Sequence, residues 1–181
     1  MEREALNYLI KRTANLAIGN STLRNQGASG LNKIARDFLC TIDLQHLSSE
    51  KDKFSENLAN LTEKLRLKFP KGANNFGAAR KSINIYLRDC LYNKYINEEF
   101  SLDHIASILE LPLDSHVAKG LELTKHKPKL PKWDAIKRLK ESENMLYQKY
   151  AGLVAGELRC NRVDLDVYLW RKIGIGALKN I

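Results

Sequence analysis

The stretch Phe76-Gly77-Ala78-Ala79-Arg80-Lys81-Ser82-Ile83 decides how this chain is interpreted. It contains a glycine, which suits a turn, and it leads into a pattern in which apolar residues recur every four positions. That spacing places them on one face of a helix. We therefore predict a glycine- and asparagine-rich turn over 72–77 and one long helix from Ala78 to about Ile96, displaying Lys81 near its start.

A second informative stretch is Leu111-Pro112-Leu113-Asp114-Ser115-His116-Val117, which predicts another helix beginning at Asp114. Aspartate suits a helix start because its side chain accepts hydrogen bonds from free backbone N–H groups. An amine and a carboxylate at two helix starts can converge on one pocket. Such a pair suits attack on a glycosidic carbon, since the amine can bond to the carbon and the carboxylate offsets positive charge.

The remaining chain is also predicted to be helical. Apolar residues follow a helical spacing over 5–18, 31–39, 54–69, 101–109 and 143–158, and the face of the last segment is Leu146, Tyr150, Leu153 and Val154. Residues 163–170 alternate as a strand would, but we interpret them as a helix because no other predicted strand can pair with them. The expected fold is all-α, in one domain spanning 1–181 with a hairpin at about 70–97.

Composition restricts the class of protein. The chain has 181 residues, of which 44% are hydrophobic and 28% charged, as is usual for a globular domain. No apolar stretch approaches the ~20 residues that a membrane span needs, and no signal peptide is visible. Three widely spaced cysteines indicate neither a disulfide framework nor a metal site, and His46, His104, His116 and Asp89 fit no metal pattern. We expect a cytoplasmic monomer without a cofactor, metal or membrane partner.

The positive charge of the chain is concentrated in one segment. The formal net charge is +9, and residues 119–140 carry eight basic residues against two acidic ones. We interpret about 119–140 as a basic loop. A smaller basic group, Lys68, Lys71, Arg80 and Lys81, surrounds the glycine turn. Two basic clusters beside a candidate site favour a polyanion as the partner, and nucleic acid is the commonest one.

Together these stretches resemble the helix-hairpin-helix superfamily of DNA glycosylases. The hairpin of that superfamily reads approximately Pro-Gly-Val-Gly-Arg-Lys-Thr-Ala, and this chain keeps its first glycine as Gly77 and its basic pair as Arg80-Lys81, while Ala79 replaces the second glycine. The stretch around Asp114 resembles the segment that supplies the family's aspartate. Leu23-Arg24-Asn25-Gln26 is similar to the family's Leu-Ser-x-Gln stretch, and Asp166-x-x-x-Trp170 to the last helix of the archaeal 8-oxoguanine branch.

The resemblance implies a two-lobed helical fold with a helix-hairpin-helix element and an active site between the lobes. It implies a DNA glycosylase that flips a modified base out of double-stranded DNA and excises it. An AP-lyase activity, which cleaves the strand after excision, is compatible with the same resemblance. The implied catalytic residues are Lys81, as nucleophile, and Asp114. The implied base pocket is Gln26, Pro112, Asp166 and Trp170, and the implied DNA contacts are Asn25, Lys71, Gly77, Arg80, Lys125, Lys127 and Lys129.

Several alternatives stay open at this stage. Trp133 is a second candidate for stacking on a base. The target is either an oxidised purine or a hypermodified phage cytosine bearing glucose. The first target would indicate a role in DNA repair and the second a role in antiviral defence. Structural interpretations also exist: Asp114 as a helix cap, Gln26 as a turn residue and Trp170 as a core residue. The chain could instead be a non-catalytic helical DNA-binding module, or a basic scaffold for RNA or an acidic protein.

Overall fold

The structure is a computed structural model, and it describes residues 2–124 and 129–169. Within these ranges every regular element is helical and none is a strand, which confirms the all-α prediction. The α-helices are α1 (Arg3–Ala17), α2 (Leu31–Leu39), α3 (Leu44–Ser49), α4 (Phe54–Lys68), α5 (Phe76–Tyr92), α6 (Lys94–Phe100), α7 (Ser115–Glu122), α8 (Glu141–Leu158) and α9 (Leu165–Leu169). Four 3-10 helices join them: η1 (Lys51–Lys53), η2 (Leu102–Ile108), η3 (Ile136–Arg138) and η4 (Arg162–Asp164). None of these helices is long and apolar enough to cross a membrane.

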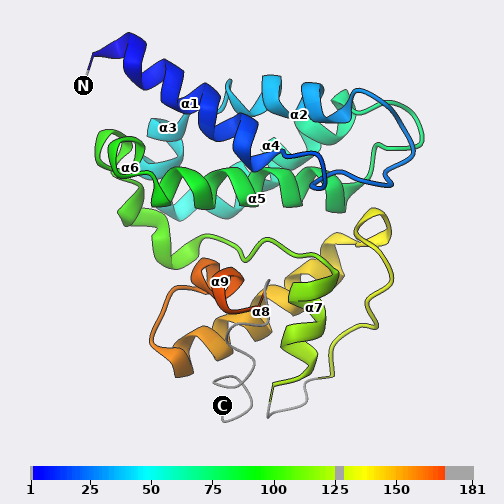
Figure 1. Cartoon of the computed structure of the whole chain (residues 1–181). Coiled ribbons are helices and arrows are strands. Elements are labelled where there is room, and N and C mark those ends of the chain that lie inside the picture. The colour runs from blue at the N-terminus through cyan, green and yellow to red at the C-terminus, as the bar shows by residue number, and fades with distance from the viewer. Residues whose placement is uncertain (1, 125–128, 170–181) are drawn as a thin grey trace.

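The described helices form two groups, one above the other in Figure 1, and each group encloses its own cluster of buried apolar side chains. The first cluster is built by α1 to α6 with η2. The second is built by residues 111–121, Leu139, α8 and α9. Helix α5 runs along the boundary between the two groups and contacts α1, α2, α4, α6, η2 and η3. Residues that α5 turns toward the second group therefore lie between the two clusters.

The turn between α4 and α5 has a defined geometry. The Ala73 N–H donates to the Pro70 carbonyl at 2.9 Å, and Gly72 has a φ of +92°, which a residue with a side chain rarely adopts. Asn75 then caps α5, because its side-chain oxygen accepts from the Ala78 N–H at 2.8 Å. The glycine that this turn needs is therefore Gly72.

Gly77 has a different task from the one predicted for it. It lies in the first turn of α5, where a Cβ atom would stand 2.0 Å from the Ile136 carbonyl oxygen and 3.1 Å from the Leu139 Cβ. The absence of a side chain lets η3 pack directly on the start of α5. This glycine serves a close approach of two backbones, so its buried position does not fit the predicted contact with DNA.

Two helical segments differ from their predictions, the first in its boundary and the second in its type of helix. The helix expected from Ala78 to about Ile96 ends at Tyr92, because the Asn93 side chain accepts from the N–H groups of Tyr95 and Ile96 and starts α6 there. The segment 101–109 is a 3-10 helix, and Ser101 has a φ of +52° with no capping hydrogen bond from its side chain.

The buried face of α8 also differs from the prediction. Leu146 and Leu153 are 50% and 63% exposed, whereas Tyr147 and Ala151 are buried. The buried stripe includes Tyr147, Tyr150, Ala151 and Val154, so the prediction is confirmed for Tyr150 and Val154 and was wrong for Leu146 and Leu153. Sequence patterning also missed α3, which Asp43 caps by accepting from the His46 N–H at 2.9 Å. The segment 165–169 is helical, as predicted.

Replacement of Gly77 by alanine tests the close packing of η3 on α5. We expect G77A to lower the free energy of unfolding by about 1–3 kcal/mol, because the new methyl group forces backbones apart. The matched control is G152A, on α8, where an added Cβ meets nothing within 4 Å. That change should stabilise the protein by up to about 1 kcal/mol through helix propensity. Urea unfolding of both variants measures the difference, and equal effects would contradict the close approach at Gly77.

Candidate active site

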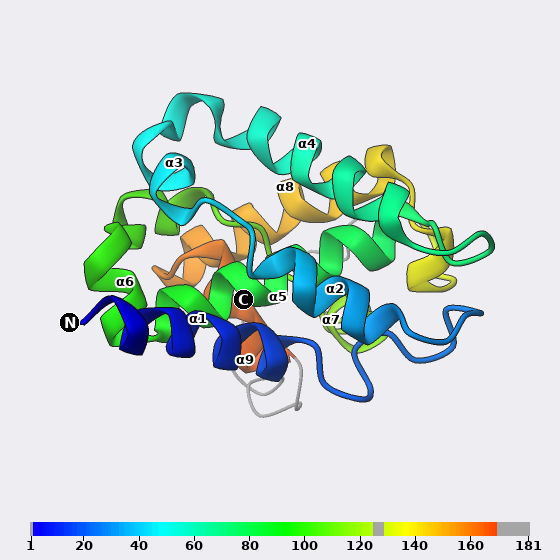
Figure 2. The same cartoon turned by 90° about the horizontal axis from the view of Figure 1, so that it is seen from above.

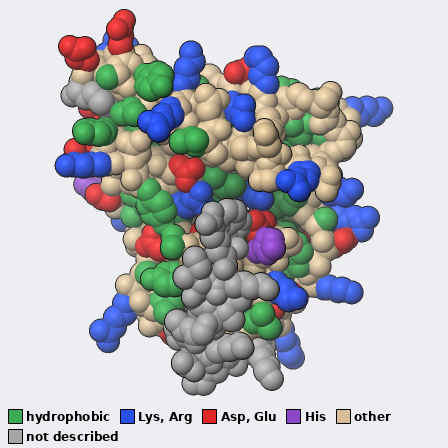
Figure 3. All heavy atoms as spheres, in the orientation of Figure 1, with side chains coloured by type: hydrophobic (Ala, Val, Ile, Leu, Met, Phe, Trp, Pro, Cys, Tyr) green, Lys and Arg blue, Asp and Glu red, His purple; other side chains and the backbone are tan. Residues whose placement is uncertain are grey.

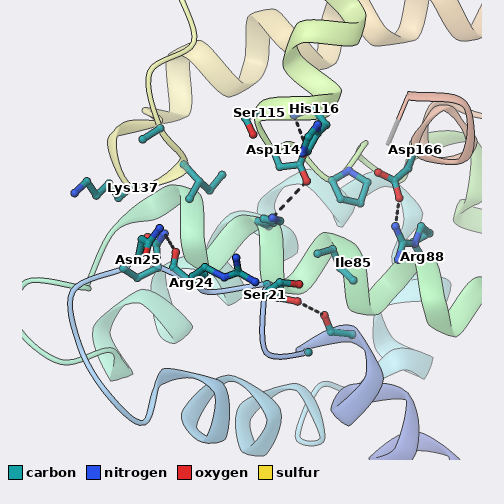
Figure 4. Close-up of a pocket in the computed structure, with 18 of the residues that line it drawn as sticks. Ser21, Arg24, Asn25, Ile85, Arg88, Asp114, Ser115, His116, Lys137 and Asp166 are labelled. Atoms are coloured by element: carbon teal, nitrogen blue, oxygen red, sulfur yellow. Dashed lines mark hydrogen bonds and ion pairs between the residues drawn. The ribbon is translucent and has the colours of Figure 1, made fainter. Parts of the chain in front are cut away.

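A cavity of about 910 Å³ opens between the two groups of helices. Its walls come from the end of α1 and the following loop, from α5, from the start of α7, from residues 133–137 and from α9. The cavity brings together residues that are far apart in the sequence, and Figure 4 draws most of those that line it. The predicted site residues among its lining are Asn25, Gln26, Lys81, Pro112, Asp114, Trp133 and Asp166.

Lys81 and Asp114 meet in the middle of the cavity. The Lys81 Nζ lies 3.6 Å from the Asp114 Oδ2, and the two side chains are 13% and 18% exposed. The other carboxylate oxygen, Oδ1, accepts from the His116 N–H at 2.9 Å and the Val117 N–H at 3.0 Å. Asp114 is therefore both the N-cap of α7 and the ionic partner of Lys81 (Figure 4). The two interactions use different oxygens and do not compete.

A second charged cluster lies farther along α5. Lys81, Ile85, Arg88 and Asp89 line the same wall, since residues four, seven and eight positions apart share a helix face. The Arg88 guanidinium donates to Asp166 of α9 through Nη1, and to the Asp89 Oδ1 through Nε at 2.9 Å and Nη2 at 2.7 Å. One cation thus holds two carboxylates at this end of the cavity.

Burial dominates the ionisation of this cluster. It raises the pKa of Asp166, and the nearby Asp114 charge adds to that rise while Arg88 opposes it. Burial also raises the pKa of Asp89, against the same opposing effect of Arg88. Burial disfavours the charge of Arg88 as well, but the two carboxylates outweigh it, so the pKa of Arg88 is raised. The Arg88 cation and the Asp89 and Asp166 carboxylates each favour the charged form of the other.

The loop between α1 and α2 forms the wall opposite α7. Gln26 is buried in it, with its Oε1 accepting from the Asn75 Nδ2 at 3.1 Å and its Nε2 donating to the Arg24 carbonyl at 3.2 Å. Gln26 therefore lines the cavity and also ties this loop to the cap of α5. Figure 2 shows the two loops extending to the same end of the molecule. Asn25, beside it, is exposed and has a φ of +63°.

Arg80 does not lie at the surface. Its side chain is 6% exposed, its Nε is 3.5 Å from the Glu110 Oε2, and its guanidinium lies 5.2 Å from the centre of the Phe76 ring. Burial lowers the pKa of Arg80, and Glu110 counteracts this. Successive helical residues point about 100° apart, so Arg80 faces the interior while Lys81 faces the cavity. The phosphate contact predicted for Arg80 does not fit this position.

Other predicted residues lie outside the cavity or outside the described ranges. Lys71 and Lys129 are exposed, and Figure 3 shows basic side chains gathered along the right-hand edge of the face it displays. Lys125, Lys127 and Trp170 lie outside the described residues. Trp133 lines the cavity and meets the Tyr147 ring edge-on at 5.6 Å between centres, while the Tyr147 hydroxyl donates to the Pro131 carbonyl at 2.7 Å.

The structure adds site residues that the sequence had not suggested: Arg24, Arg88, Asp89 and Lys137. For Arg88 and Asp89 a signal existed, because they follow Lys81 by seven and eight positions on a predicted helix. Arg24 and Lys137 lie in a loop and a short 3-10 helix, where no periodicity indicates direction.

Among the described residues, no group of three or more His, Cys, Asp or Glu side chains is arranged to hold a metal ion. Comparison of the chain with protein-family models, with curated proteins and with solved structures finds no match. The function has therefore to be inferred from the geometry of the cavity.

Removal of the Arg88 charge tests the coupling of the three groups. We expect R88M to lower the free energy of unfolding by about 2–4 kcal/mol at pH 7, because it leaves two buried carboxylates without their cation. The folded-state pKa values of Asp89 and Asp166 are already raised and should rise further. A raised carboxylate pKa makes stability fall as pH increases above the ordinary value of 3.8.

The loss in R88M should therefore be smaller at pH 4.5 than at pH 7. Urea unfolding at both pH values measures it, with R12M on the exposed surface of α1 as the control. A loss that does not change with pH would show that Arg88 contributes by packing alone.

Proposed function

We propose that this protein is a DNA glycosylase that excises a modified base. The observation that carries the proposal is the approach of the Lys81 Nζ to within 3.6 Å of the Asp114 Oδ2 inside a 910 Å³ cavity. The two residues are 33 positions apart and come from helices of different groups. A volume of this size is in the range of small-molecule sites, so an extruded nucleotide can be accommodated.

The chemistry follows from the two groups. Asp114 can accept a proton from the Lys81 ammonium, leaving a neutral amine whose nitrogen attacks the anomeric carbon of the sugar. The bond between that carbon and the base breaks as the new C–N bond forms, and the base leaves with the bonding electrons and takes up the proton that Asp114 had accepted, so that Asp114 is a carboxylate again. The Asp114 carboxylate offsets positive charge that develops on the sugar. The bond between the anomeric carbon and the ring oxygen then breaks, and the ring oxygen takes up the proton that the Lys81 nitrogen loses. The opened product is a Schiff base on Lys81, from which strand cleavage by elimination can follow.

In this proposal the two groups of helices are the two lobes, and α4, the turn over 69–75 and α5 are the helix-hairpin-helix element. The partner is double-stranded DNA, and the protein acts as a monomer. The exposure of Lys71 in the hairpin and of Lys129 in the basic segment supports phosphate binding by these residues.

The substrate is either an oxidised purine or a hypermodified cytosine. A panel of duplexes, each with one modified base, separates these possibilities when it is incubated with the protein and the released bases are measured. Genomic DNA from phages with glucosylated cytosine belongs in the same panel. Release of no base from any substrate would contradict the proposal.

The lysine is tested by replacing its amine with an amide. We expect K81Q to fold and to lose base release, together with the covalent adduct that borohydride traps between the protein and substrate DNA. The control is K64Q, because Lys64 is an exposed lysine on α4 outside the cavity. A non-catalytic DNA-binding module would form no trapped adduct at all. Undiminished trapping in K81Q would instead move the reaction to another amine, with Lys71 the first to examine.

The aspartate is tested by removing its charge while keeping its cap. Asparagine is as good an N-cap as aspartate, so D114N should change the free energy of unfolding by less than about 1 kcal/mol. The single-turnover rate of base release should fall by ~10² or more, because the developing positive charge loses its counterion. DNA affinity should change little. A near-normal rate would mean that Asp114 only caps α7.

A further inference from the structure

The cavity is electrically asymmetric from one end to the other. Arg24 and Lys137 line one end, Lys81 and Asp114 the middle, and the cluster of Arg88, Asp89 and Asp166 the other end. Figure 4 shows this order directly, with Arg24, Asn25 and Lys137 on one side of Asp114 and Arg88 and Asp166 on the other. One end therefore carries two positive charges beside one carboxylate, Asp134, which is paired with Arg138, and the other end carries two carboxylates on one guanidinium.

The two cations at the positive end are available to a ligand. Both side chains are exposed, and within the described part of the chain neither Arg24 nor Lys137 forms an ion pair. The acid nearest to Lys137 in the sequence, Asp134, also lines the cavity and is paired with Arg138. In Figure 4 the Arg24 side chain runs inward along the cavity from its loop. Within the described ranges, no side-chain hydrogen bond or ion pair uses either of these two charges.

An extruded nucleotide has a matching asymmetry. Its phosphates are anionic and its base carries N–H donors, with the sugar between them. Arg and Lys side chains bind phosphate oxygens, and carboxylates accept N–H donors. The reverse orientation would place a phosphate beside Asp89 and Asp166, where like charges repel in a partly buried site.

We infer that the cavity binds the target nucleotide in one direction, with Arg24 and Lys137 holding a phosphate next to the target sugar and the base directed toward Arg88 and Asp166. This inference rests on the proposed function and assigns binding residues and an orientation to it. The sugar is then held at both sides, so its anomeric carbon lies at Lys81. Arg24 and Lys137 are binding residues here and take no part in bond breaking.

The test uses binding alone and so does not depend on catalysis. The probe is a duplex with one tetrahydrofuran residue, an abasic analogue that cannot react, and versions of it in which one flanking phosphate at a time is a neutral methylphosphonate. Against the unmodified probe, R24Q and K137Q should each bind about tenfold more weakly. Each should also reduce the log–log salt slope by about 0.9, the value for one lost phosphate contact.

The methylphosphonate duplexes identify the contact. Wild-type protein should lose a similar factor with the methylphosphonate at one flanking position, and R24Q and K137Q should lose little or nothing further there. The matched controls are R12Q and K132Q, because Arg12 and Lys132 are exposed basic residues outside the cavity lining. Both controls should keep the full methylphosphonate penalty.

An equal penalty in R24Q, K137Q and wild type at every position would overturn the inference. So would wild-type binding that does not distinguish the tetrahydrofuran duplex from an unmodified one. The proposed function is tested separately, by base release. If no base is released but R24Q and K137Q lose the methylphosphonate penalty as expected, the glycosylase is refuted and the phosphate site is supported. Base release with an unchanged methylphosphonate penalty in R24Q and K137Q would support the glycosylase and refute the phosphate site.

Discussion

The burial of α5 on nearly all its sides is the constraint on which the cavity depends, because it leaves only one row of that helix open. Between Gly77 and Leu91 the residues that are not fully buried are Lys81, Ile85, Arg88 and Asp89. All four line the cavity. The packing of the first cluster around the other faces of α5 therefore fixes the rotation of the helix, and with it the direction of the Lys81 amine. A helix packed on one side only could rotate and lose this direction.

The cavity wall that carries Asp114 is held in place by polar contacts of the connector between η2 and α7, residues 109–114. Glu110 accepts from the Asn84 Nδ2 of α5 at 3.0 Å and the Asn144 Nδ2 of α8 at 3.2 Å, and it faces Arg80. The Gln148 side chain bonds both backbone groups of Leu111, at 2.9 and 2.8 Å. The connector is thus attached to both groups of helices three or four residues before Asp114. Arg80 then has a role as neighbour to Glu110, which explains a basic residue buried beside the cavity lysine.

The sequence alone was sufficient for the helical class and for the pairing of Lys81 with Asp114 as candidates. The helical class follows from apolar spacing, and a helix start at Asp114 follows from its capping side chain. The choice of Lys81 and Asp114 as a pair also rested on the resemblance of their two stretches to a glycosylase superfamily. The sequence alone did not predict that Arg80 points into the interior or that Gly77 allows the close approach of η3, because both depend on which segment packs against α5. The stop at Asn93 was missed because apolar spacing continues through it while its cap acts locally. The Arg88 cluster needed α9 to be placed in space, since Asp166 is 78 positions away.

The two ends of the cavity also differ in how their charges are maintained. At the Arg88 end the charges are partly buried and stabilise one another, so they are part of the folded structure. At the Arg24 end they are exposed, and among the described residues no acid neutralises them. Exposed cations that form no ion pair contribute little to the stability of a fold. Their position beside a lysine and a carboxylate that face each other is understandable if an anion binds there, and in the proposed function that anion is a phosphate adjoining the target sugar.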